Sequence, residues 1–409
     1  MRAPPRTLRV AVVGHVDHGK STLIGRLLWD GGALGREQRG YVRRLARELG
    51  DDAGLAWLTD QLAEERDERR TLDTAQAFME RGGVRYVLID TPGHREFLAN
   101  MLTGASRAEA AVLVVAAEAG VQEQTRQHAW VLHLLGLDRP LVAVNKMDLA
   151  DWRQDTFRAL AAQVETLLAE LGMQASGVIP LSALAGPGVV RGRPAWYRGP
   201  TLLEALAGLA GARGARDGPC RFPVQDVYQE EGRPLAVGRL ARGQISAGDA
   251  LHVFPSGGLV KVVQVRRFGQ RRRRAWEGES IGLGLEPARG VARGSLLSDP
   301  RSPCPAAERF SAVLLGLEGV RQGEPFRLEV ATQEAGCRLE ALARRLDTGT
   351  FQVLEAPARG LEAGEAGLAT LALDRPLALE TFGQCAELGR FILLREGRVA
   401  AVGVVRELL

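Results

Sequence analysis

The stretch VAVVGHVDHGKST, which spans Val10–Thr22, is the strongest indication of fold class in this sequence. It has the spacing G-x-x-x-x-G-K-[ST] of a phosphate-binding loop, and it continues the apolar, strand-like run Leu8–Val13. In such a loop the backbone N–H groups surround phosphates, the lysine reaches the β- and γ-phosphate oxygens, and the serine hydroxyl holds Mg²⁺. We therefore expect a nucleotide site whose phosphate contacts are Gly14, His15, Val16, Asp17, His18, Gly19, Lys20, Ser21 and Thr22.

Length and composition narrow the class of protein. The 409 residues correspond to about two to four domains, and 45% hydrophobic with 25% charged residues is typical of a folded chain. No run approaches the roughly 18 apolar residues of a membrane span, and Met1–Pro5 shows no signal-peptide layout. The four cysteines lie far apart without a C-x-x-C pair, which disfavours zinc or disulfides. We therefore expect a cytoplasmic protein that uses no membrane, and the net charge of +4 is too small for a chain built mainly to coat nucleic acid.

The hydrophobic pattern divides the chain into three regions. Residues 1–210 alternate strand-like runs, such as Ala111–Val115, with helical stretches, such as Thr156–Leu171. This alternation predicts an α/β domain with a doubly wound, mostly parallel sheet. After a linker rich in Gly, Ala and Arg, short strand-like runs separated by turn residues predict one β-barrel domain at 219–300 and a second at 305–409.

A second strand ends in residues suited to metal and water chemistry. The run Val87–Ile89 leads into Asp90, at the place where a carboxylate can hold Mg²⁺ through water. Gly93 can offer its backbone N–H to the γ-phosphate, and His94 can orient the attacking water. Because these residues accompany a phosphate-binding loop, we interpret them as the part of the site that hydrolyses the γ-phosphate.

A third strand end predicts the base. Asn145, Lys146 and Asp148 form the pattern N-K-x-D. Guanine presents N1–H and an amino group side by side, and the Asp148 carboxylate can accept both, whereas adenine offers no such pair. Lys146 can lay its aliphatic stem along the base, and Asn145 can brace the loops. We therefore expect GTP and GDP as ligands, with backbone N–H groups near the guanine O6 from Ser182, Ala183 and Leu184.

These motifs resemble those of the translation-factor class of GTPases, which includes elongation factors Tu and 1-alpha. The resemblance rests on His15–His18, Asp90–His94 and Asn145–Asp148. It implies a P-loop GTPase domain followed by two β-barrel domains, and GTP hydrolysis as the activity. The expected Mg²⁺ ligands are Ser21, Thr71 and Asp90, and the expected catalytic residues are His94, Lys20 and Thr71.

Finer matches resemble the GTPase subunit of bacterial sulfate adenylyltransferase. They are Leu23–Asp30, Asn100–Ser106, Trp196–Glu204, Arg221–Tyr228, Leu373–Ala378 and Gly389–Leu393. This resemblance covers nearly the whole chain. It implies that GTP hydrolysis drives the formation of adenylyl sulfate and pyrophosphate from ATP and sulfate. The expected partner is then the small catalytic subunit of that enzyme.

Two other interpretations of the function stay open, and so does the role of one arginine run. The chain can instead be an elongation-factor-like GTPase that binds aminoacyl-tRNA and acts with tRNA or the ribosome, since His18 is the elongation-factor residue at its position. The arginine run Arg271–Arg274 can contact RNA phosphates, an acidic partner or only solvent. The chain can also be a GTPase that hydrolyses little, because Arg69 and Arg70 replace the Gly and Ile that precede Thr71 in the family's first switch.

Overall fold

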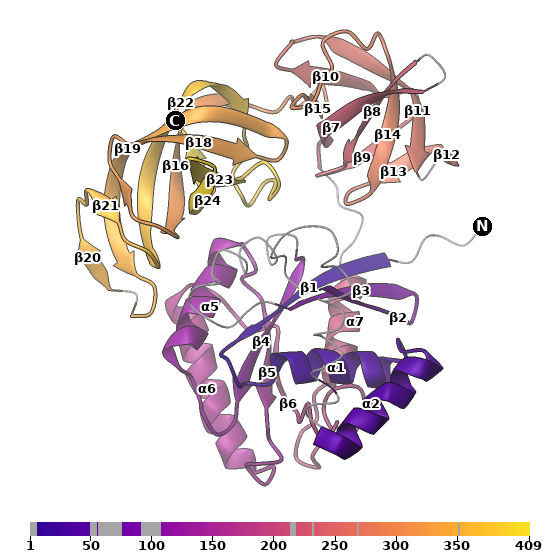
Figure 1. Ribbon diagram of the computed structural model, residues 1–409, viewed down its shortest axis with the longest axis vertical. Helices are drawn as coiled ribbons and strands as arrows, with labels where there is room; N and C mark the ends of the chain where they lie inside the picture. The colour runs from indigo at the N-terminus through magenta and orange to yellow at the C-terminus, as the bar shows by residue number, and fades with distance from the viewer. Residues whose placement is uncertain are drawn as a thin grey trace. The chain divides into compact units, whose positions relative to one another are not determined.

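The computed structural model describes residues 6–49, 55, 76–90, 108–212, 218–230, 233–267, 270–350 and 352–409 (Figure 1). The chain divides into two compact units that separate near Arg213. The first unit contains a six-stranded sheet with its helices, and the second contains two β-barrels. The expected fold class, an α/β domain followed by two β-barrel domains, is confirmed. The domain limits 1–210, 219–300 and 305–409 stay predictions.

The six-stranded sheet has the order β2-β3-β1-β4-β5-β6. Five of its strands are parallel, and β2 pairs antiparallel with β3 at one edge. The strands span Arg6–Gly14 (β1), Gln76–Arg81 (β2), Val84–Asp90 (β3), Ala110–Ala116 (β4), Leu141–Asn145 (β5) and Gly177–Pro180 (β6). Strands β4 and β5 are buried along their whole length, as expected where helices cover both faces of a parallel sheet.

Helices lie on both faces of this sheet (Figure 1). They span Lys20–Gly31 (α1), Arg36–Leu49 (α2), Glu123–Leu134 (α5), Gln154–Glu170 (α6) and Leu202–Ala212 (α7). Val10 and Val12 of β1 point to the same face and join an apolar core with Leu23 of α1 and Leu206 of α7. The expected helix at 156–171 corresponds to α6, whereas α2 and the edge strand β2 were not expected. Within the described residues, every helix is too short or too polar to span a bilayer.

The parallel arrangement brings the carboxyl ends of four strands to one edge of the sheet. Strands β1, β3, β5 and β6 end at Gly14, Asp90, Asn145 and Pro180, next to the motifs described above. Ligands of doubly wound sheets bind beyond this edge. The fold therefore places the candidate site there.

The first barrel has the strand order β10-β15-β7-β8-β14-β11-β12 and is closed by pairing of β10 with β11. Its strands span Arg221–Glu230 (β7), Arg233–Arg239 (β8), Ala250–Phe254 (β10), Leu259–Arg267 (β11), Gln270–Arg272 (β12), Ser280–Glu286 (β14) and Leu296–Ser298 (β15). In addition, β9 (Gln244–Ser246) pairs with β13 (Arg274–Trp276). Val260, Val262 and Leu283 are among the residues that fill the interior.

The second barrel has the order β18-β23-β24-β16-β22-β19-β20 and is closed by pairing of β18 with β19. Its strands span Ala306–Gly316 (β16), Pro325–Val330 (β18), Gln333–Asp347 (β19), Val353–Glu355 (β20), Glu365–Ala378 (β22), Arg390–Arg395 (β23) and Arg398–Leu408 (β24). In addition, β17 (Val320–Arg321) pairs with β21 (Gly360–Leu361). In its core the rings of Phe310 and Phe391 meet edge to face, with centroids 5.4 Å apart.

A buried ion pair joins the two barrels within the second unit. Arg221 of β7 donates to Glu380 Oε1 from Nε at 2.9 Å and from Nη2 at 2.5 Å, and its Nη1 donates to the carbonyl of Ser302 at 2.8 Å. The side chains of Arg221 and Glu380 are 2% and 5% exposed. Because a charge removed from water is tolerated only when it is paired and hydrogen-bonded, each side chain requires the other.

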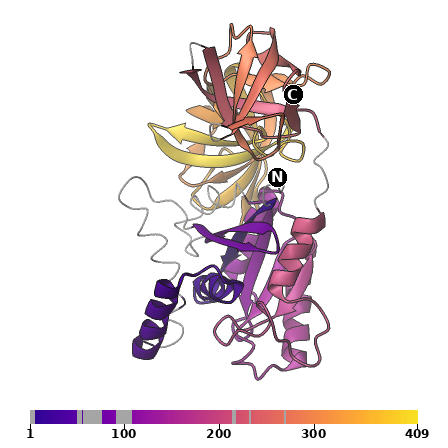
Figure 2. The ribbon, with the colours of Figure 1, turned by 90° about the vertical axis from the view of Figure 1, so that its right-hand side faces the viewer.

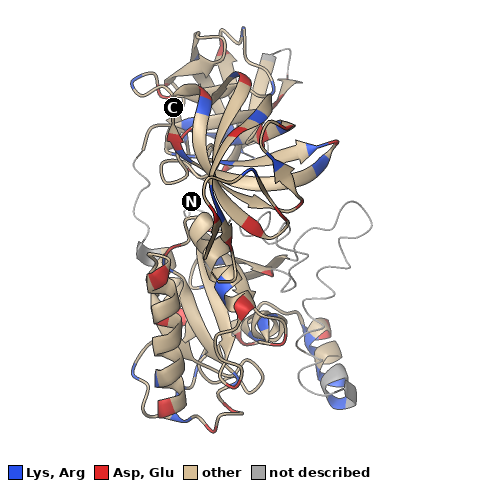
Figure 3. Ribbon diagram, turned by 90° about the vertical axis from the view of Figure 1, so that its left-hand side faces the viewer, with Lys and Arg blue, Asp and Glu red and all other residues tan. Residues whose placement is uncertain are grey.

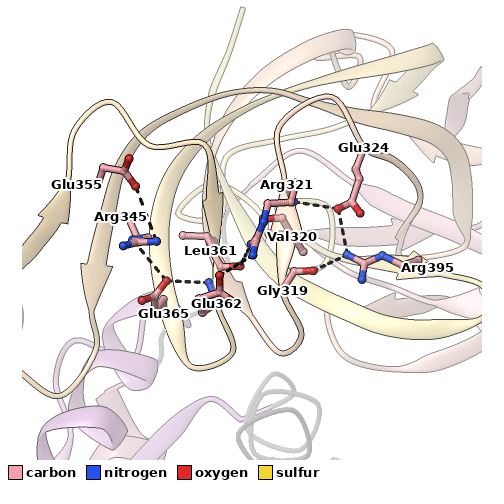
Figure 4. Close-up of polar contacts among 10 residues, drawn as sticks. All are labelled: Gly319, Val320, Arg321, Glu324, Arg345, Glu355, Leu361, Glu362, Glu365 and Arg395. Carbon is pink, nitrogen blue, oxygen red and sulfur yellow. Dashed lines mark hydrogen bonds and ion pairs between the residues drawn. The ribbon is translucent and has the colours of Figure 1, made fainter.

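Exposed ion pairs tie the short β17–β21 sheet to the strands around it (Figure 4). Arg321 donates from Nη2 to Glu362 Oε1 at 2.5 Å, and its backbone N–H donates to Glu324 Oε2 at 2.9 Å. Arg395 of β23 donates to the same oxygen of Glu324 at 3.1 Å. Single exposed pairs contribute about 0–1 kcal/mol, so the network orders these turns more than it stabilises the barrel.

Candidate guanine-nucleotide site

The loop between β1 and α1 has the backbone shape of a phosphate cradle. Asp17 (φ 65°) and Gly19 (φ 82°) adopt left-handed conformations, and Gly14 has a φ of 152°. A Cβ atom on Gly14 would lie 2.4 Å from the carbonyl oxygen of Val114, and one on Gly19 would lie 2.5 Å from Asn145 Nδ2. The packing of the loop therefore requires both glycines. The loop leads into the N-terminus of α1, where free N–H groups and the helix dipole favour phosphate.

Lys20 lies across this loop and is 8% exposed. Its Nζ donates hydrogen bonds to the carbonyl oxygens of Gly14 (2.7 Å) and His15 (2.9 Å). Burial lowers the pKa of Lys20, while the carboxylates of Asp90 and Asp17 act in the opposite direction. Since an ammonium group has three N–H donors, one remains for a phosphate oxygen.

Ser21 and Asp90 meet at the end of β3. The Ser21 hydroxyl donates to Asp90 Oδ2 at 3.1 Å, so a hydroxyl and a carboxylate lie side by side near the phosphate loop. Mg²⁺ prefers hard oxygen ligands, retains several waters and completes its shell with substrate phosphates. The donor set therefore fits Mg²⁺, with Ser21 and Asp90 as the residues that would hold it.

Asn145, the last residue of β5, connects three loops. Its Nδ2 donates to the carbonyl of His18 at 2.8 Å, and its Oδ1 accepts the N–H of Ala183 at 2.8 Å. The side chain is 2% exposed, so both hydrogen bonds lie away from water, where leaving either group unpaired is costly. The phosphate loop, the base motif and the loop after β6 are thus held in one arrangement.

Asp148 presents an unsatisfied acceptor at the place expected for the base. The preceding Lys146 adopts a φ of 60°, which turns the chain after β5, and the N–H of Met147 donates to the carbonyl of Leu181 at 3.2 Å. Asp148 Oδ1 is buried without a hydrogen-bond partner among the described residues. A buried carboxylate oxygen is normally paired. The adjacent N–H donors of guanine are of the right kind to satisfy it.

The loop expected near the guanine O6 is already engaged with the protein at two positions. The N–H of Ser182 donates to the carbonyl of Pro187 at 3.0 Å, and that of Ala183 donates to Asn145 as described. Of these three expected residues, Leu184 is the one whose backbone N–H has no partner among the described residues. The residues of this loop were expected from the sequence, but their division of roles was not.

Arg26 of α1 is a site residue that the sequence did not predict. Its Nε donates to the carbonyl of Ala183 at 2.9 Å, and its Nη2 donates to the carbonyl of Leu184. Arg26 thus holds the same loop by binding the carbonyl groups of two of its residues. No motif signals this role, because it depends on where the fold places α1 relative to the loop after β6.

Two histidines in and near the phosphate loop are buried. His18 Nδ1 lies 3.2 Å from the carbonyl oxygen of Val114, and His18 and His128 of α5 are 2% and 3% exposed. Burial lowers the pKa of His18 to about 4 and that of His128 to about 3, and the charges of Lys20 and His15 lower both further. Both imidazoles are therefore neutral at pH 7.

Some of the expected site residues cannot be located. Thr71, Gly93 and His94 lie outside the described residues, as do Arg69 and Arg70. The structure brings the other expected residues to the carboxyl edge of the sheet. They are the phosphate-loop residues 14–22, Asp90, Asn145, Lys146, Asp148 and the loop 182–184.

Comparison with protein families defines the class. The model of the elongation factor Tu GTP binding domain matches residues 5–211, and that of the GTP-eEF1A C-terminal domain-like family matches residues 310–406. A GTP-binding domain with this phosphate loop, followed by two β-barrels, makes the protein a GTPase of the translation-factor class.

The most similar proteins narrow the assignment. The elongation factor 1-alpha of Natronomonas pharaonis is 34% identical over 97% of this chain and 96% of its own length. That of Methanosarcina mazei is 33% identical over 99% of this chain and 98% of its own. Solved structures of sup35 with GDP and with GMPPNP are 23% and 24% identical, with TM-scores of 0.47 over 99% of this chain and 94% of theirs. The chain belongs to the elongation factor Tu and elongation factor 1-alpha family of GTPases.

These relatives correct the finer expectation drawn from the sequence. The interpretation as a sulfate adenylyltransferase subunit, with the small catalytic subunit as partner, is wrong, because the full-length relatives are named elongation factor 1-alpha. The short matches at Leu23–Asp30 and Arg221–Tyr228 lie in α1 and β7, which serve the shared nucleotide pocket and barrel. Short motifs of that kind identify the class but do not separate its branches.

Proposed function

We propose that the protein is a translational GTPase of the elongation factor 1-alpha type. It binds aminoacyl-tRNA in its GTP state and releases it on the ribosome after hydrolysis, in the cytoplasm. The observation that supports this function best is the 34% identity to elongation factor 1-alpha along 97% of the chain. Similarity limited to the nucleotide site would cover only the GTPase domain, whereas these relatives align along 97–99% of the chain and so include both barrels.

The bound nucleotide is held through its phosphates. Lys20 and the loop N–H groups neutralise phosphate charge, and Ser21 and Asp90 are the residues that would hold Mg²⁺. A bound Mg²⁺ would supply further positive charge against the phosphates. The hydrogen bond between Ser21 and Asp90 supports this assignment, because it keeps both oxygen ligands at one point before the ion arrives.

The residues to which we assign contact with the γ-phosphate lie outside the described part of the chain. We assign the second Mg²⁺ hydroxyl to Thr71, the γ-phosphate N–H contact to Gly93 and the orientation of the attacking water to His94. Segments that contact the γ-phosphate change position when it leaves. Such a change is what allows a GTPase to bind a partner differently in its two nucleotide states.

Guanine is selected by the braced base motif. Asp148 accepts the N1–H and amino group of the base, Lys146 covers its face, and Leu184 donates to O6. Asn145 acts through the loops that it joins and holds them at a fixed separation. The unpaired Asp148 Oδ1 supports this assignment.

A basic hairpin in the first barrel is the feature that we assign to tRNA contact. Arg271–Arg274 form no ion pair with a carboxylate within the described residues, whereas the neighbouring Arg266 and Arg267 each pair with a glutamate. Trp276 is 48% exposed, and the guanidinium of Arg274 lies 5.3 Å from its ring. Arginines without a carboxylate partner among the described residues, beside an exposed aromatic ring, suit the phosphates and bases of RNA.

Filter binding of charged tRNA tests the proposal. The purified protein is loaded with a non-hydrolysable GTP analogue or with GDP and mixed with labelled aminoacyl-tRNA, with uncharged tRNA as the control. We expect about 5- to 150-fold tighter binding of aminoacyl-tRNA in the GTP-analogue state, the usual range of such coupling. Equal retention in both states, or no retention, rejects this function while leaving the guanine-nucleotide site intact.

A further inference from the structure

Three consecutive peptide groups form the loop after β6, and two of them have their N–H groups engaged. In the first, which joins Ser182 to Ala183, the N–H donates to Asn145 Oδ1 at 2.8 Å. In the third, which joins Leu184 to Ala185, the N–H donates to the Ser182 hydroxyl at 3.0 Å. The N–H of the middle peptide, between Ala183 and Leu184, has no partner in the part of the chain that the structure describes. It is the group that we assign to the guanine O6.

Arg26 of α1 binds the same middle peptide at its carbonyl group. Its Nε donates to the carbonyl of Ala183 at 2.9 Å, and its Nη2 donates to the carbonyl of the next residue, Leu184. A peptide bond is planar and trans, so its C=O and its N–H point in opposite directions. Because Arg26 fixes the carbonyl of the middle peptide on the side of α1, the N–H of Leu184 points away from that helix.

The positive charge of Arg26 also strengthens this N–H as a donor. A carbonyl that accepts a charge-assisted hydrogen bond polarises its whole amide group, and the N–H of that amide becomes a better donor in turn. Arg26 is half-buried, so water screens its charge only in part. Orientation and polarisation therefore act on the same N–H, that of Leu184.

Position distinguishes Arg26 from the other basic residues. Lys and Arg, drawn blue in Figure 3, occur on many elements of the chain, so positive charge alone does not mark a functional residue. Helix α1, seen along its axis in Figure 2, begins with Lys20 and Ser21, whose side chains bind the phosphate loop and Asp90. Arg26 follows about 9 Å further along this helix. One helix therefore carries phosphate contacts at its start and holds the O6 donor with its second turn.

We propose that Arg26 is a specificity-determining positioning residue, which orients and polarises the Leu184 N–H for the C6 carbonyl oxygen of guanine. The inference rests on the proposed guanine pocket and deepens it. In that pocket Asp148 accepts the N1–H and the amino group of the base, whereas Arg26 acts on O6 alone, through Leu184. Its contribution to affinity therefore depends on which atom occupies position 6 of the purine.

Modified nucleotides separate the O6 contact from the other contacts of the base. The diphosphate of 6-thioguanosine, 6-thio-GDP, keeps the N1–H and the amino group but replaces O6 by sulfur, which is a weaker acceptor. Inosine diphosphate, IDP, keeps O6 and the N1–H but lacks the amino group. The affinities of the full chain for GDP, 6-thio-GDP and IDP are measured by competition with a fluorescent GDP in the presence of Mg²⁺.

The variant is Arg26→Met, which keeps a long apolar stem and removes every N–H donor of the side chain. Arg26→Gln, which removes the charge and shortens the side chain, is a second variant, so that the test does not depend on the folding of one protein. Arg39→Met is the matched control. Arg39 of α2 also donates from Nε and Nη2 to two backbone carbonyls, those of Leu34 and Trp29, both at 3.3 Å.

We expect the wild type and Arg39→Met to bind GDP about five- to tenfold more tightly than 6-thio-GDP, a difference typical of one hydrogen bond. In both Arg26 variants the preference for GDP over 6-thio-GDP should shrink to about twofold or less, because the donor to O6 is no longer fixed. The preference for GDP over IDP depends on Asp148 and should keep its wild-type value in all variants.

Arg26 variants that keep the wild-type preference for GDP over 6-thio-GDP overturn the inference. This holds whether their affinities are unchanged or all reduced by the same factor, which is the result of a merely structural role. An equal change in Arg39→Met also overturns it, as does a wild type that binds GDP and 6-thio-GDP equally. A wild type that binds none of the three nucleotides tightly shows instead that the proposed guanine pocket itself is wrong.

Discussion

The side-chain amide of Asn145 donates a 2.8 Å hydrogen bond to the carbonyl oxygen of His18. This bond joins the end of β5 to the loop after β1, across a sheet in which β4 lies between those two strands. The same side chain accepts the N–H of Ala183. The spacing between the phosphate subsite and the base subsite is therefore set by one residue that contacts neither ligand group in our assignment.

Asn145→Ala should weaken nucleotide binding without unfolding the protein. The change removes two buried hydrogen bonds and leaves the N–H of Ala183 unpaired, which together amount to about 2–3 kcal/mol. GDP affinity should fall roughly 30- to 150-fold in a fluorescent-nucleotide titration. Thr166→Ala, which removes one exposed hydrogen bond to Ala162, should bind GDP like the wild type. Unchanged GDP affinity in Asn145→Ala contradicts the bracing role.

Gly19 and Gly32 form a matched pair of left-handed glycines that flank α1. Their φ angles are 82° and 83°, but a Cβ on Gly19 would lie 2.5 Å from Asn145 Nδ2, whereas nothing lies within 4 Å of one on Gly32. Gly32→Ala should cost about 1–2 kcal/mol of stability and leave GDP affinity intact. Gly19→Ala should cost the same conformational strain and also lower GDP affinity at least tenfold. Equal GDP affinity in the two variants would show that crowding at Asn145 is unimportant.

The buried histidines predict a loss of stability on mild acidification. Their folded-state pKa values, about 4 for His18 and about 3 for His128, lie below the unfolded value of 6.5, so unfolding takes up protons below pH 6.5. The free energy of unfolding therefore has its full value above about pH 6.5. It falls by about 1.4 kcal/mol per pH unit for each histidine as the pH decreases towards these folded-state pKa values.

His128→Leu isolates one of these contributions. Its Nδ1 has no hydrogen-bond partner among the described residues, so an apolar side chain should be tolerated. Between pH 7 and pH 5, denaturant unfolding should show about 2 kcal/mol less destabilisation than in the wild type. His18 remains in the variant, and its own burial still lowers its pKa to about 4. Parallel pH curves for the two proteins would contradict the pKa assigned to His128.

Glu380→Gln should destabilise the second unit strongly. It leaves the Arg221 guanidinium buried without its counter-charge, a change that typically costs about 3–5 kcal/mol. The double replacement Arg221→Met, Glu380→Leu removes both charges and should be much closer to neutral. Thermal unfolding of the full chain followed by circular dichroism provides the comparison. A double variant as unstable as Glu380→Gln would show that packing, not charge, dominates this junction.

Residue patterns predicted most of the fold. Runs such as Ala111–Val115 and Leu141–Val144 indicate strands because both faces of a parallel sheet are buried. The edge strand β2 was not predicted because the apolar run Ala77–Met79 is short and does not alternate in sequence, since Phe78 is exposed between two buried residues. Helix α2 was not predicted because Arg36–Leu49 contains few apolar residues that would mark a buried side. Both elements lie at the margin of the unit, where burial leaves a weak trace in sequence.

The site divides in the same way. Glycines, Lys20 and Asp148 are dictated by the chemistry of phosphates and guanine, so their spacing alone was informative. Arg26 and His128 act through tertiary contacts, and an arginine or histidine within a helix has no local signature for such roles. Short motifs could not identify the branch of the family either. They reflect the nucleotide pocket that all branches share and not the partner that each branch binds.

Asp148 provides the most direct test of the central claim, that this protein is built around a guanine-nucleotide pocket. Asp148→Asn replaces an acceptor by a donor, which opposes the amino group of guanine but suits the C2 carbonyl of xanthine. Equilibrium binding of GDP, XDP and ADP to both proteins decides the matter. We predict that the wild type binds only GDP tightly, and that the variant loses roughly 100-fold or more in GDP affinity while gaining XDP. Tight ADP binding by the wild type, or unchanged GDP affinity in the variant, would contradict the account.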